Sequence, residues 1–267
     1  MMKNTERIIK KYCEFFGFAP YGIFEDKLLN CRGRSKIPEN TKTVITVLFP
    51  YYLGEEAYES LNVSRYAAVS DYHVVAGKYL GLICEELKKE YPDNQFIYFA
   101  DNSPVPEVFA AVKSGLGMKG RNGLFINEKY GSWVFIGEIL TDLFIPCEGQ
   151  EIKLCDNCGK CLDACPTGVL KEERFNPDKC LSHITQKKGE IPEEYKNMMK
   201  RLNCAWGCDE CQKACPYNIN AEKTTIREFI ESFNPVVTSE TSVEGRAFEW
   251  RGEKVIRRNI EVLEEKL

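Results

Sequence analysis

Thirteen cysteines are the residues of this 267-residue sequence with the clearest chemistry, and eight of them fall into two short motifs. In the first motif, 155–165, the cysteines are separated by two, two and three residues, and a proline follows the last one. This is the C-x2-C-x2-C-x3-C-P run, in which three thiolates hold one 4Fe-4S cube and the fourth reaches a second cube. The second motif, 204–215, repeats the pattern with one extra residue between its first two cysteines. Together the motifs predict two 4Fe-4S clusters.

The same crossing rule divides the cysteines between the two cubes. One cube receives Cys155, Cys158, Cys161 and Cys215. The other receives one further thiolate in addition to Cys165, Cys208 and Cys211. Two cysteines compete for this eighth position, Cys180 and Cys204. Spacing alone favours Cys204, because it completes a near copy of the first motif, although the extra residue lengthens the loop that wraps the corner of a cube.

A pair of zinc ribbons is the alternative interpretation of these cysteines. Zinc ribbons require neither a closing Cys-Pro nor three or four cysteines within about a dozen residues. The two histidines, His73 and His183, do not lie near a cysteine pair at the spacing of a mixed zinc site. We therefore prefer iron–sulfur clusters. The isolated cysteines are interpreted as small buried or semi-buried hydrophobic residues, and they are Cys13, Cys31, Cys84 and Cys147.

Composition and charge are those of an ordinary folded protein. Hydrophobic residues make up 43% and charged residues 28%, which argues against disorder. The first residues lack the apolar core of a signal peptide, and no stretch of about 18 apolar residues could cross a membrane. We therefore expect a cytoplasmic protein whose cysteines stay reduced. The net charge of −4 gives no overall attraction to nucleic acid, and the basic candidates for phosphate contacts are residues 196–201 and 251–258.

The residues before the cysteine motifs alternate between helical and strand patterns. Apolar spacing and a proline at a first helical turn predict helices at 5–16, 71–90 and 106–114. Runs of β-branched and aromatic residues predict strands at 43–49, 95–100, 124–127 and 133–140. The segment 246–267 has the pattern of a charged amphipathic helix.

The fold class that we expect is α+β, with three parts in sequence. An α/β layered domain occupies residues 1–146, and a bacterial ferredoxin-like double-cluster domain occupies 147–235. A C-terminal helical tail follows at 236–267. A bare two-cluster protein needs only the middle part, so the first domain must use the electrons.

Several motifs resemble those of the epoxyqueuosine reductase family in order and spacing. Those in the first domain are Ser64-Arg-Tyr-Ala, Asp71-Tyr-His73, Asp101-Asn-Ser-Pro104, Gly115-Leu-Gly-x-x-Gly-Arg-Asn122 and Gly131-Ser-Trp-Val-Phe-Ile-Gly-Glu138. Those around the cysteines are Lys179-Cys-Leu-Ser-His-Ile-Thr185 and Gly207-Cys-Asp-Glu-Cys-Gln-Lys-Ala-Cys-Pro-Tyr-Asn218. The resemblance covers about residues 40–255.

The resemblance implies an oxidoreductase of queuosine biosynthesis and tRNA processing, which removes the epoxide oxygen from epoxyqueuosine in tRNA to give queuosine. It implies cobalamin in the domain 1–146 and an external electron donor such as flavodoxin or ferredoxin. Asp101 matches the family's proton donor, and a positioned carboxylic acid can protonate the oxygen as the ring opens. The resemblance also selects Cys180 over Cys204 as the eighth cluster ligand. The implied cobalamin contacts are Arg65, Tyr66, Asp101, Phe125, Ile136 and Gln186.

Two further patterns are set aside. Asp71-x-His73-x-x-x-Gly77 is similar to a cobalt-ligating signature, but its glycine is one residue too far along and lies within an expected helix. We therefore expect no protein side chain below the cobalt. Gly115-x-Gly-x-x-Gly120 copies a dinucleotide-binding fingerprint, but it follows a helix where that fingerprint follows a strand. Nicotinamide binding is therefore not expected.

Two other functions compete with the leading hypothesis. Members of the family often continue into a C-terminal helical-repeat domain that helps to hold tRNA, whereas this sequence ends soon after Trp250-Arg-Gly252 and is acidic. The first alternative is therefore a related cobalamin-dependent reductase of a small molecule, similar to a reductive dehalogenase. The second is a non-catalytic iron–sulfur electron carrier. Asp101 argues against the carrier, which needs no proton donor beside its cofactor.

The two motifs predict the metal content directly. Anaerobically purified protein should contain about eight iron and about eight acid-labile sulfide per chain, the content of two cubes. Metal and sulfide analysis of the same sample checks this. Near-stoichiometric zinc with little sulfide would contradict it and favour the zinc ribbons.

Overall fold

The computed structural model describes residues 2–265, which divide into two compact units. Unit 1 comprises the chain up to Pro50 together with Tyr72–Glu128 and Val134–Asn157. Unit 2 comprises Tyr51–Asp71, Lys129–Trp133 and the chain from Cys158 onward. The units are interleaved along the sequence, whereas the predicted domains follow one another. The roles assigned to those domains stay predictions.

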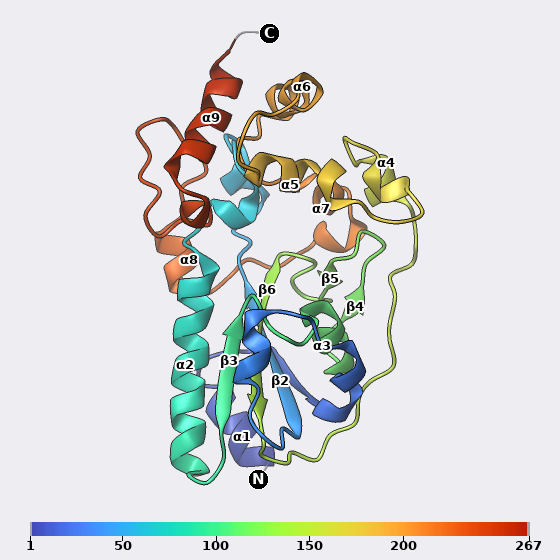
Figure 1. Cartoon of the computed structure of the whole chain (residues 1–267), viewed down its shortest axis with the longest axis vertical. Helices are drawn as coiled ribbons and strands as arrows, with labels where there is room; N and C mark the ends of the chain where they lie inside the picture. The colour runs from blue at the N-terminus through green and yellow to red at the C-terminus, as the bar shows by residue number, and fades with distance from the viewer. Residues whose placement is uncertain (1, 266–267) are drawn as a thin grey trace. The chain divides into compact units, whose positions relative to one another are not determined.

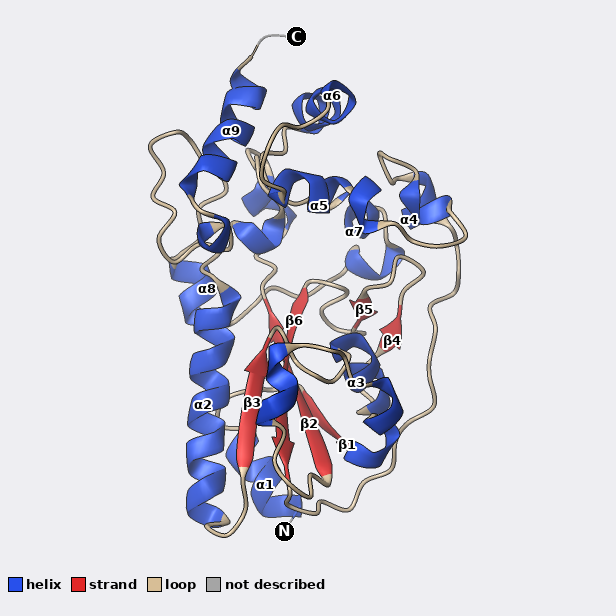
Figure 2. Ribbon diagram, in the orientation of Figure 1, coloured by secondary structure: helices blue, strands red, loops and turns tan. Residues whose placement is uncertain are grey.

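Unit 1 is built on a four-stranded antiparallel sheet with the strand order β1-β2-β6-β3. Figure 2 shows these strands, which are β1 (Phe16–Pro20), β2 (Thr43–Pro50), β6 (Val134–Thr141) and β3 (Phe96–Ala100). Every residue of β2 and all but the first of β6 are buried, as expected of central strands covered on both faces. A short hairpin joins β4 (Met118–Lys119) to β5 (Phe125–Ile126).

Helices pack against both faces of this sheet. Helix α2 (Tyr72–Glu90) runs alongside β3 (Figure 1), and its Leu80 packs against Gly137 of β6. A Cβ atom on Gly137 would lie 2.7 Å from Leu80, so the glycine permits the close approach of the helix. Helix α3 (Glu107–Lys113) packs through its alanines against the other face, which carries Val44, Leu48, Ile136 and Leu140. Helix α1 (Met2–Ile9) contacts α2.

Most of the elements expected in unit 1 are present. The strands expected at 43–49, 95–100 and 133–140 and the helix at 71–90 are confirmed within two residues at each end. The helix expected at 5–16 is wrong in length, because α1 ends at Ile9 and Phe16 already pairs with Val47 in β1. Strand β1 was not predicted. It is five residues long and contains Gly17 and Pro20, residues that in a short segment indicate a turn.

Unit 2 is helical, and its described residues contain no strand. The helix expected at 246–267 begins later than predicted, because Gly252 has a φ of 81° and α9 begins only after it; the last two residues of the expected helix lie outside the described residues. None of the helices within residues 2–265 has the length and apolar character of a membrane span. The α-helices of unit 2 are α4 (Lys160–Asp163), α5 (Leu181–Gln186), α6 (Glu193–Leu202), α7 (Glu210–Lys213), α8 (Arg227–Glu231) and α9 (Glu253–Glu264).

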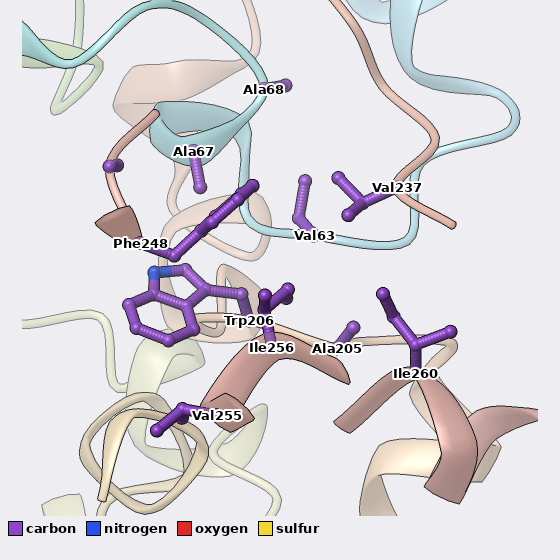
Figure 3. Packing of buried hydrophobic residues seen from close by; sticks show 11 residues of the cluster. Val63, Ala67, Ala68, Ala205, Trp206, Val237, Phe248, Val255, Ile256 and Ile260 are labelled. Atoms are coloured by element: carbon purple, nitrogen blue, oxygen red, sulfur yellow. The ribbon is translucent and has the colours of Figure 1, made fainter. Parts of the chain in front are cut away.

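The core of unit 2 centres on Trp206 and Phe248, both fully buried (Figure 3). Their rings meet edge to face with centroids 5.7 Å apart, and the indole Nε1 of Trp206 donates a hydrogen bond to the hydroxyl of Tyr66 at 2.8 Å. Helix α9 adds Val255, Ile256 and Ile260 to the same cluster. The segment predicted as a separate tail is therefore part of the core of this unit.

Phe248 and Trp250 provide a matched pair for testing this core, because they lie two residues apart and only Trp250 is exposed, at 58%. Phe248→Ala should lower the free energy of unfolding by about 3–5 kcal/mol, since it removes a buried ring and leaves a cavity. Trp250→Ala should have a much smaller effect. The urea midpoints of the anaerobically purified variants measure both. Equal midpoints would contradict the assignment of Phe248 to the core.

Candidate active site and iron–sulfur centres

Asp101 lies in a strained turn at the end of β3. Its φ is 68° and that of Asn102 is 53°, so two consecutive residues that are not glycine occupy the left-handed region. Such residues cost about 1–3 kcal/mol each and cluster at functional sites. The segment before β2 supports the turn: Cys31 Sγ donates a hydrogen bond to the Asn102 carbonyl oxygen at 3.4 Å. A Cβ on Gly33 would lie 2.6 Å from the same oxygen, so this contact requires glycine.

The carboxylate of Asp101 faces the first turn of α2. Its Oδ2 lies 3.2 Å from Nε2 of His73 and accepts a hydrogen bond from Nδ2 of Asn102 at 3.0 Å. The hydrogen bond with His73 lowers the pKa of Asp101, against the opposing effect of partial burial, because it stabilises the ionised form. The side chains of Asp101 and His73 are 44% and 39% exposed, so a ligand can reach both.

Two further carboxyl groups near this turn were not identified as site residues from the sequence. Glu107 begins α3, and burial together with the charge of Asp101 raises its pKa to about 7. Glu138 of β6 is fully buried, and burial raises its pKa well above the usual value. Its Oε2 is hydrogen-bonded to the hydroxyl of Ser103. Glu138 could have been found from the sequence, because it stands inside the apolar strand predicted at 133–140 and buried carboxyl groups are rare without a special role.

Arg65, a predicted cobalamin contact, is buried within unit 2. Its guanidinium forms two hydrogen bonds with the carboxylate of Glu55, at 2.6 and 2.7 Å, and lies 4.5 Å from the ring centroid of Trp133 and 4.7 Å from that of Tyr58. Its backbone N–H donates to the buried carboxylate of Asp209 at 2.7 Å. Arg65 therefore ties the segment 51–71 to the second cysteine motif.

The other predicted cobalamin contacts fall into two groups. In unit 2, Tyr66 is hydrogen-bonded to Gln186 through its hydroxyl, which accepts from Nε2 at 3.4 Å. In unit 1, Phe125 and Ile136 are buried in one apolar cluster beneath α3. The structure thus brings together the members of each pair. Their contact with cobalamin stays a prediction.

The basic candidates for phosphate contacts are largely engaged within the protein. On α6, Lys196 and Lys200 form ion pairs with Glu193 and Glu265. Arg258 donates hydrogen bonds to the carbonyl oxygens of Lys187 and Gly189. These contacts leave fewer positive charges of residues 196–201 and 251–258 available for the phosphates of tRNA. They fit a structural role for these side chains.

None of the thirteen cysteines is in a disulfide, as iron–sulfur ligation requires. Burial raises the pKa of Cys165, but hydrogen bonds from the Thr167 hydroxyl and from the backbone N–H groups of Leu170, Thr167 and Gly168 outweigh it and leave the pKa lowered. In unit 1, Sγ of Cys155 accepts a hydrogen bond from the backbone N–H of Arg121 at 3.2 Å. Backbone N–H groups aimed at sulfur suit a thiolate that ligates a cluster.

The two candidates for the eighth ligand have different surroundings in unit 2. Cys204 and Cys208 line the same cavity, of about 290 Å³, and Cys204 Sγ donates a hydrogen bond to the carbonyl oxygen of Gly207 at 3.2 Å. Cys180 immediately precedes α5, whose Leu181 and Ile184 belong to the apolar cluster on which Cys208 packs. The choice between Cys180 and Cys204 stays a prediction.

We expect Cys180→Ala to lose about half of the iron, the content of one cube, and Cys204→Ala to keep both cubes. The reason is that the Cys204 thiol already donates to a carbonyl oxygen, as a protonated thiol does. Iron counting and electron paramagnetic resonance of reduced samples measure this, with Cys13→Ala as a control at a buried isolated cysteine. Loss of one cube in Cys204→Ala, with both retained in Cys180→Ala, would show that spacing is the better guide.

Comparison with known protein families gives two matches within the chain. Residues 154–218 match the family described as "4Fe-4S double cluster binding domain", which confirms the prediction of two clusters. Residues 34–102 match the family described as "Epoxyqueuosine reductase QueG, DUF1730". The first match contains both cysteine motifs completely, and the second contains Asp101 and Asn102 of the turn.

Solved structures share the fold. A structure of epoxyqueuosine reductase with an epoxyqueuosine-modified tRNA-Tyr stem loop has a TM-score of 0.80 and 24% identity, and the match covers 98% of this chain and 80% of that one. A reductive dehalogenase described in terms of B12-dependent dehalogenation has a TM-score of 0.50 and 16% identity, with 97% of this chain and 35% of that chain covered. At these identities the two structures establish a common fold.

Curated relatives establish the family. An epoxyqueuosine reductase from Leadbetterella byssophila is 36% identical over 211 residues, which is 78% of this chain and 68% of the relative. Another from Lactococcus garvieae is 33% identical over 258 residues, which is 89% of this chain and 73% of the relative. The resemblance found in the sequence is therefore confirmed, and the chain belongs to the epoxyqueuosine reductase family, a family of oxidoreductases.

Proposed function

We propose that this chain reduces epoxyqueuosine in tRNA to queuosine, with cobalamin and two 4Fe-4S clusters as cofactors. The observation that carries the proposal is the Asp101 turn, in which a carboxylate in left-handed backbone contacts His73. The partly exposed carboxyl group is able to hand a proton to an oxygen atom that leaves carbon. An epoxide provides such an oxygen, and the family to which the chain belongs is named for an epoxide substrate.

The protein's own residues position the reactants and move a proton. Asp101 rests as the carboxylate that the hydrogen bond with His73 stabilises, and it relays a proton through a carboxyl oxygen to the epoxide oxygen as the carbon–oxygen bond breaks. Cobalamin, when bound, supplies the two-electron reduction of the substrate carbon. The eight predicted thiolates hold the clusters through which electrons arrive one at a time.

One feature of the predicted cobalamin contacts fits a large polar cofactor. Nε of Arg65 is buried and has no hydrogen-bond partner among residues 2–265, which leaves one donor for an acceptor such as an amide oxygen. Among the predicted contacts, Tyr66 and Gln186 of unit 2 are polar and Phe125 and Ile136 of unit 1 are apolar, which are the two kinds of side chain that cofactor sites usually combine. These five residues and Asp101 make up the proposed set.

The partners follow from the reaction. An external one-electron donor such as flavodoxin or ferredoxin must reduce the clusters, and tRNA carrying the epoxide is the proposed substrate. We place the reaction in the cytoplasm, where tRNA and reduced clusters coexist.

The proposal is tested by anaerobic reconstitution of the full chain with iron, sulfide and cobalamin, followed by reduction in the presence of tRNA that carries epoxyqueuosine. Digestion and mass spectrometry of the nucleosides should reveal queuosine. Two matched reactions, one without cobalamin and one with the free epoxyqueuosine nucleoside, separate the hypotheses. Turnover of the nucleoside with none of the tRNA would favour a small-molecule reductase. No turnover of either would contradict the proposed function.

Asp101→Asn should retain both clusters and cobalamin and lower turnover by roughly two to four orders of magnitude, the range for loss of a general acid. Asp93→Asn, which changes an exposed aspartate of the same unit, is the matched control and should turn over as the unchanged protein does. Iron content, cobalamin absorbance and turnover are measured on the same samples. Unchanged turnover in Asp101→Asn would assign the proton donor to another group.

A further inference from the structure

Cys155, a predicted ligand of one cube, lies where two segments of unit 1 pair with each other. They are the hairpin of β4 and β5 and the stretch 148–157, which leads into the first cysteine motif. The backbone N–H of Lys119 donates to the carbonyl oxygen of Lys153 at 2.9 Å, and the N–H of Cys155 donates to the carbonyl oxygen of Lys119 at 3.1 Å. Because the N–H of Arg121 also donates to its Sγ, Cys155 is fixed to the hairpin by two hydrogen bonds.

Two large apolar side chains close to Cys155 in the same stretch are exposed to solvent. Leu154, directly before the cysteine, is 68% exposed, and Ile152 is 52% exposed. A single exposed apolar residue needs no explanation, but two of them next to a cluster ligand provide apolar area for contact with another protein. They favour a protein over tRNA as the partner, because nucleic acid bases stack on aromatic side chains and these two are aliphatic.

Three cationic side chains stand on the residues that pair here. Lys119, Arg121 and Lys153 are exposed, and within residues 2–265 none of them forms an ion pair or a side-chain hydrogen bond. Their charges are therefore available to a partner, unlike those of the lysines on α6. The acidic residue next to the apolar pair is Glu151, which is also exposed.

The cube of Cys155 includes the most accessible of the predicted ligands. The crossing rule places Cys155 and Cys158 in the same cube. Cys158 is exposed, whereas the seven other predicted ligands are buried or half-buried. Electron transfer between proteins weakens steeply with distance, so a donor protein must dock where a cube lies close to solvent.

We propose that the external electron donor docks on the surface formed by Lys119, Arg121, Ile152, Lys153 and Leu154, and that this donor is a small carrier protein with an acidic face around its redox centre. The inference rests on the external donor of the proposed function. The cations attract the acidic face, and the apolar pair provides the contact beside the cube. The reduced carrier gives one electron to the cube of Cys155 and leaves oxidised, and no atom or proton is exchanged. Complexes of this kind are small and short-lived, as a surface of five side chains requires.

The test compares two reductants of the clusters by stopped-flow absorbance in the full chain. One is a reduced plant-type ferredoxin, an acidic one-electron carrier, and the other is photoreduced deazariboflavin, which is small and carries no net charge. We expect Lys119→Gln combined with Arg121→Gln to lower the rate constant for ferredoxin roughly tenfold at low salt and less at high salt, because salt screens the attraction. Leu154→Gln should lower it at both salt concentrations, and Glu151→Gln should raise it. The rate with deazariboflavin should stay unchanged in every variant.

Lys10→Gln and Leu29→Gln are matched controls, since each changes an exposed side chain of the same type in the same unit. They should change neither rate, and the iron content of every sample is measured. Equal ferredoxin rates in the surface variants and the controls would overturn the proposal. A fall with both reductants would overturn it too, because it would show damage to the cube. So would a loss of affinity for unmodified tRNA, measured by fluorescence anisotropy, with the ferredoxin rate unchanged, and this result would assign the surface to tRNA.

The rates of cluster reduction separate this inference from the proposed function, because they need neither tRNA nor cobalamin. If ferredoxin reduces the clusters through this surface but the chain reduces no epoxyqueuosine, the proposed function fails and the docking surface stands. If the chain produces queuosine while all variants accept electrons from ferredoxin equally fast, the inference alone fails.

Discussion

The register of β6 between β2 and β3 is the constraint on which unit 1 depends. In this register Glu138 lies opposite Thr46 on one side and Phe99 on the other, and the neighbouring Gly137 lies opposite Ala100. A slip of one residue would exchange the two faces of the strand. It would place the glutamate against α2 and remove the glycine against which Leu80 packs. The end of β3, the start of α2 and the buried carboxyl group are thus fixed by one set of backbone hydrogen bonds.

Three carboxyl groups in this frame differ in proton affinity because they differ in burial and partners. Asp101 is accessible and hydrogen-bonded to His73, which favours its carboxylate. Glu107 is partly buried beside that negative charge, and Glu138 is completely removed from water. The same functional group therefore spans the range from ionised to protonated within one site, as pairs of acids in other active sites do. The strained turn at the end of β3 keeps Asp101, the most acidic of the three carboxyl groups, accessible to solvent.

What could be predicted from the sequence was mostly local. The cysteine motifs could be recognised because ligation of a cube depends on the spacing of cysteines along the chain. The strand before Asp101 could be recognised because the apolar segment 95–100 ends there. The short strand β1 was missed, since its pairing with β2 is a tertiary contact and its glycine and proline suggest a turn. Glu107 was missed because its raised pKa depends on folding beside Asp101. The inclusion of 51–71 in unit 2 likewise depends on contacts such as that of Arg65 with Asp209.

In the proposed reaction the Asp101 site delivers protons to the departing oxygen and to no carbon atom. A single turnover of epoxyqueuosine-modified tRNA by the cofactor-loaded chain in heavy water tests it, followed by back-exchange in ordinary water and mass spectrometry of the nucleoside. We expect a product that has lost one oxygen atom and carries no deuterium on carbon, because both protons leave with the oxygen as water. A product that retains deuterium on carbon, or one that keeps the oxygen as a hydroxyl group, would contradict it.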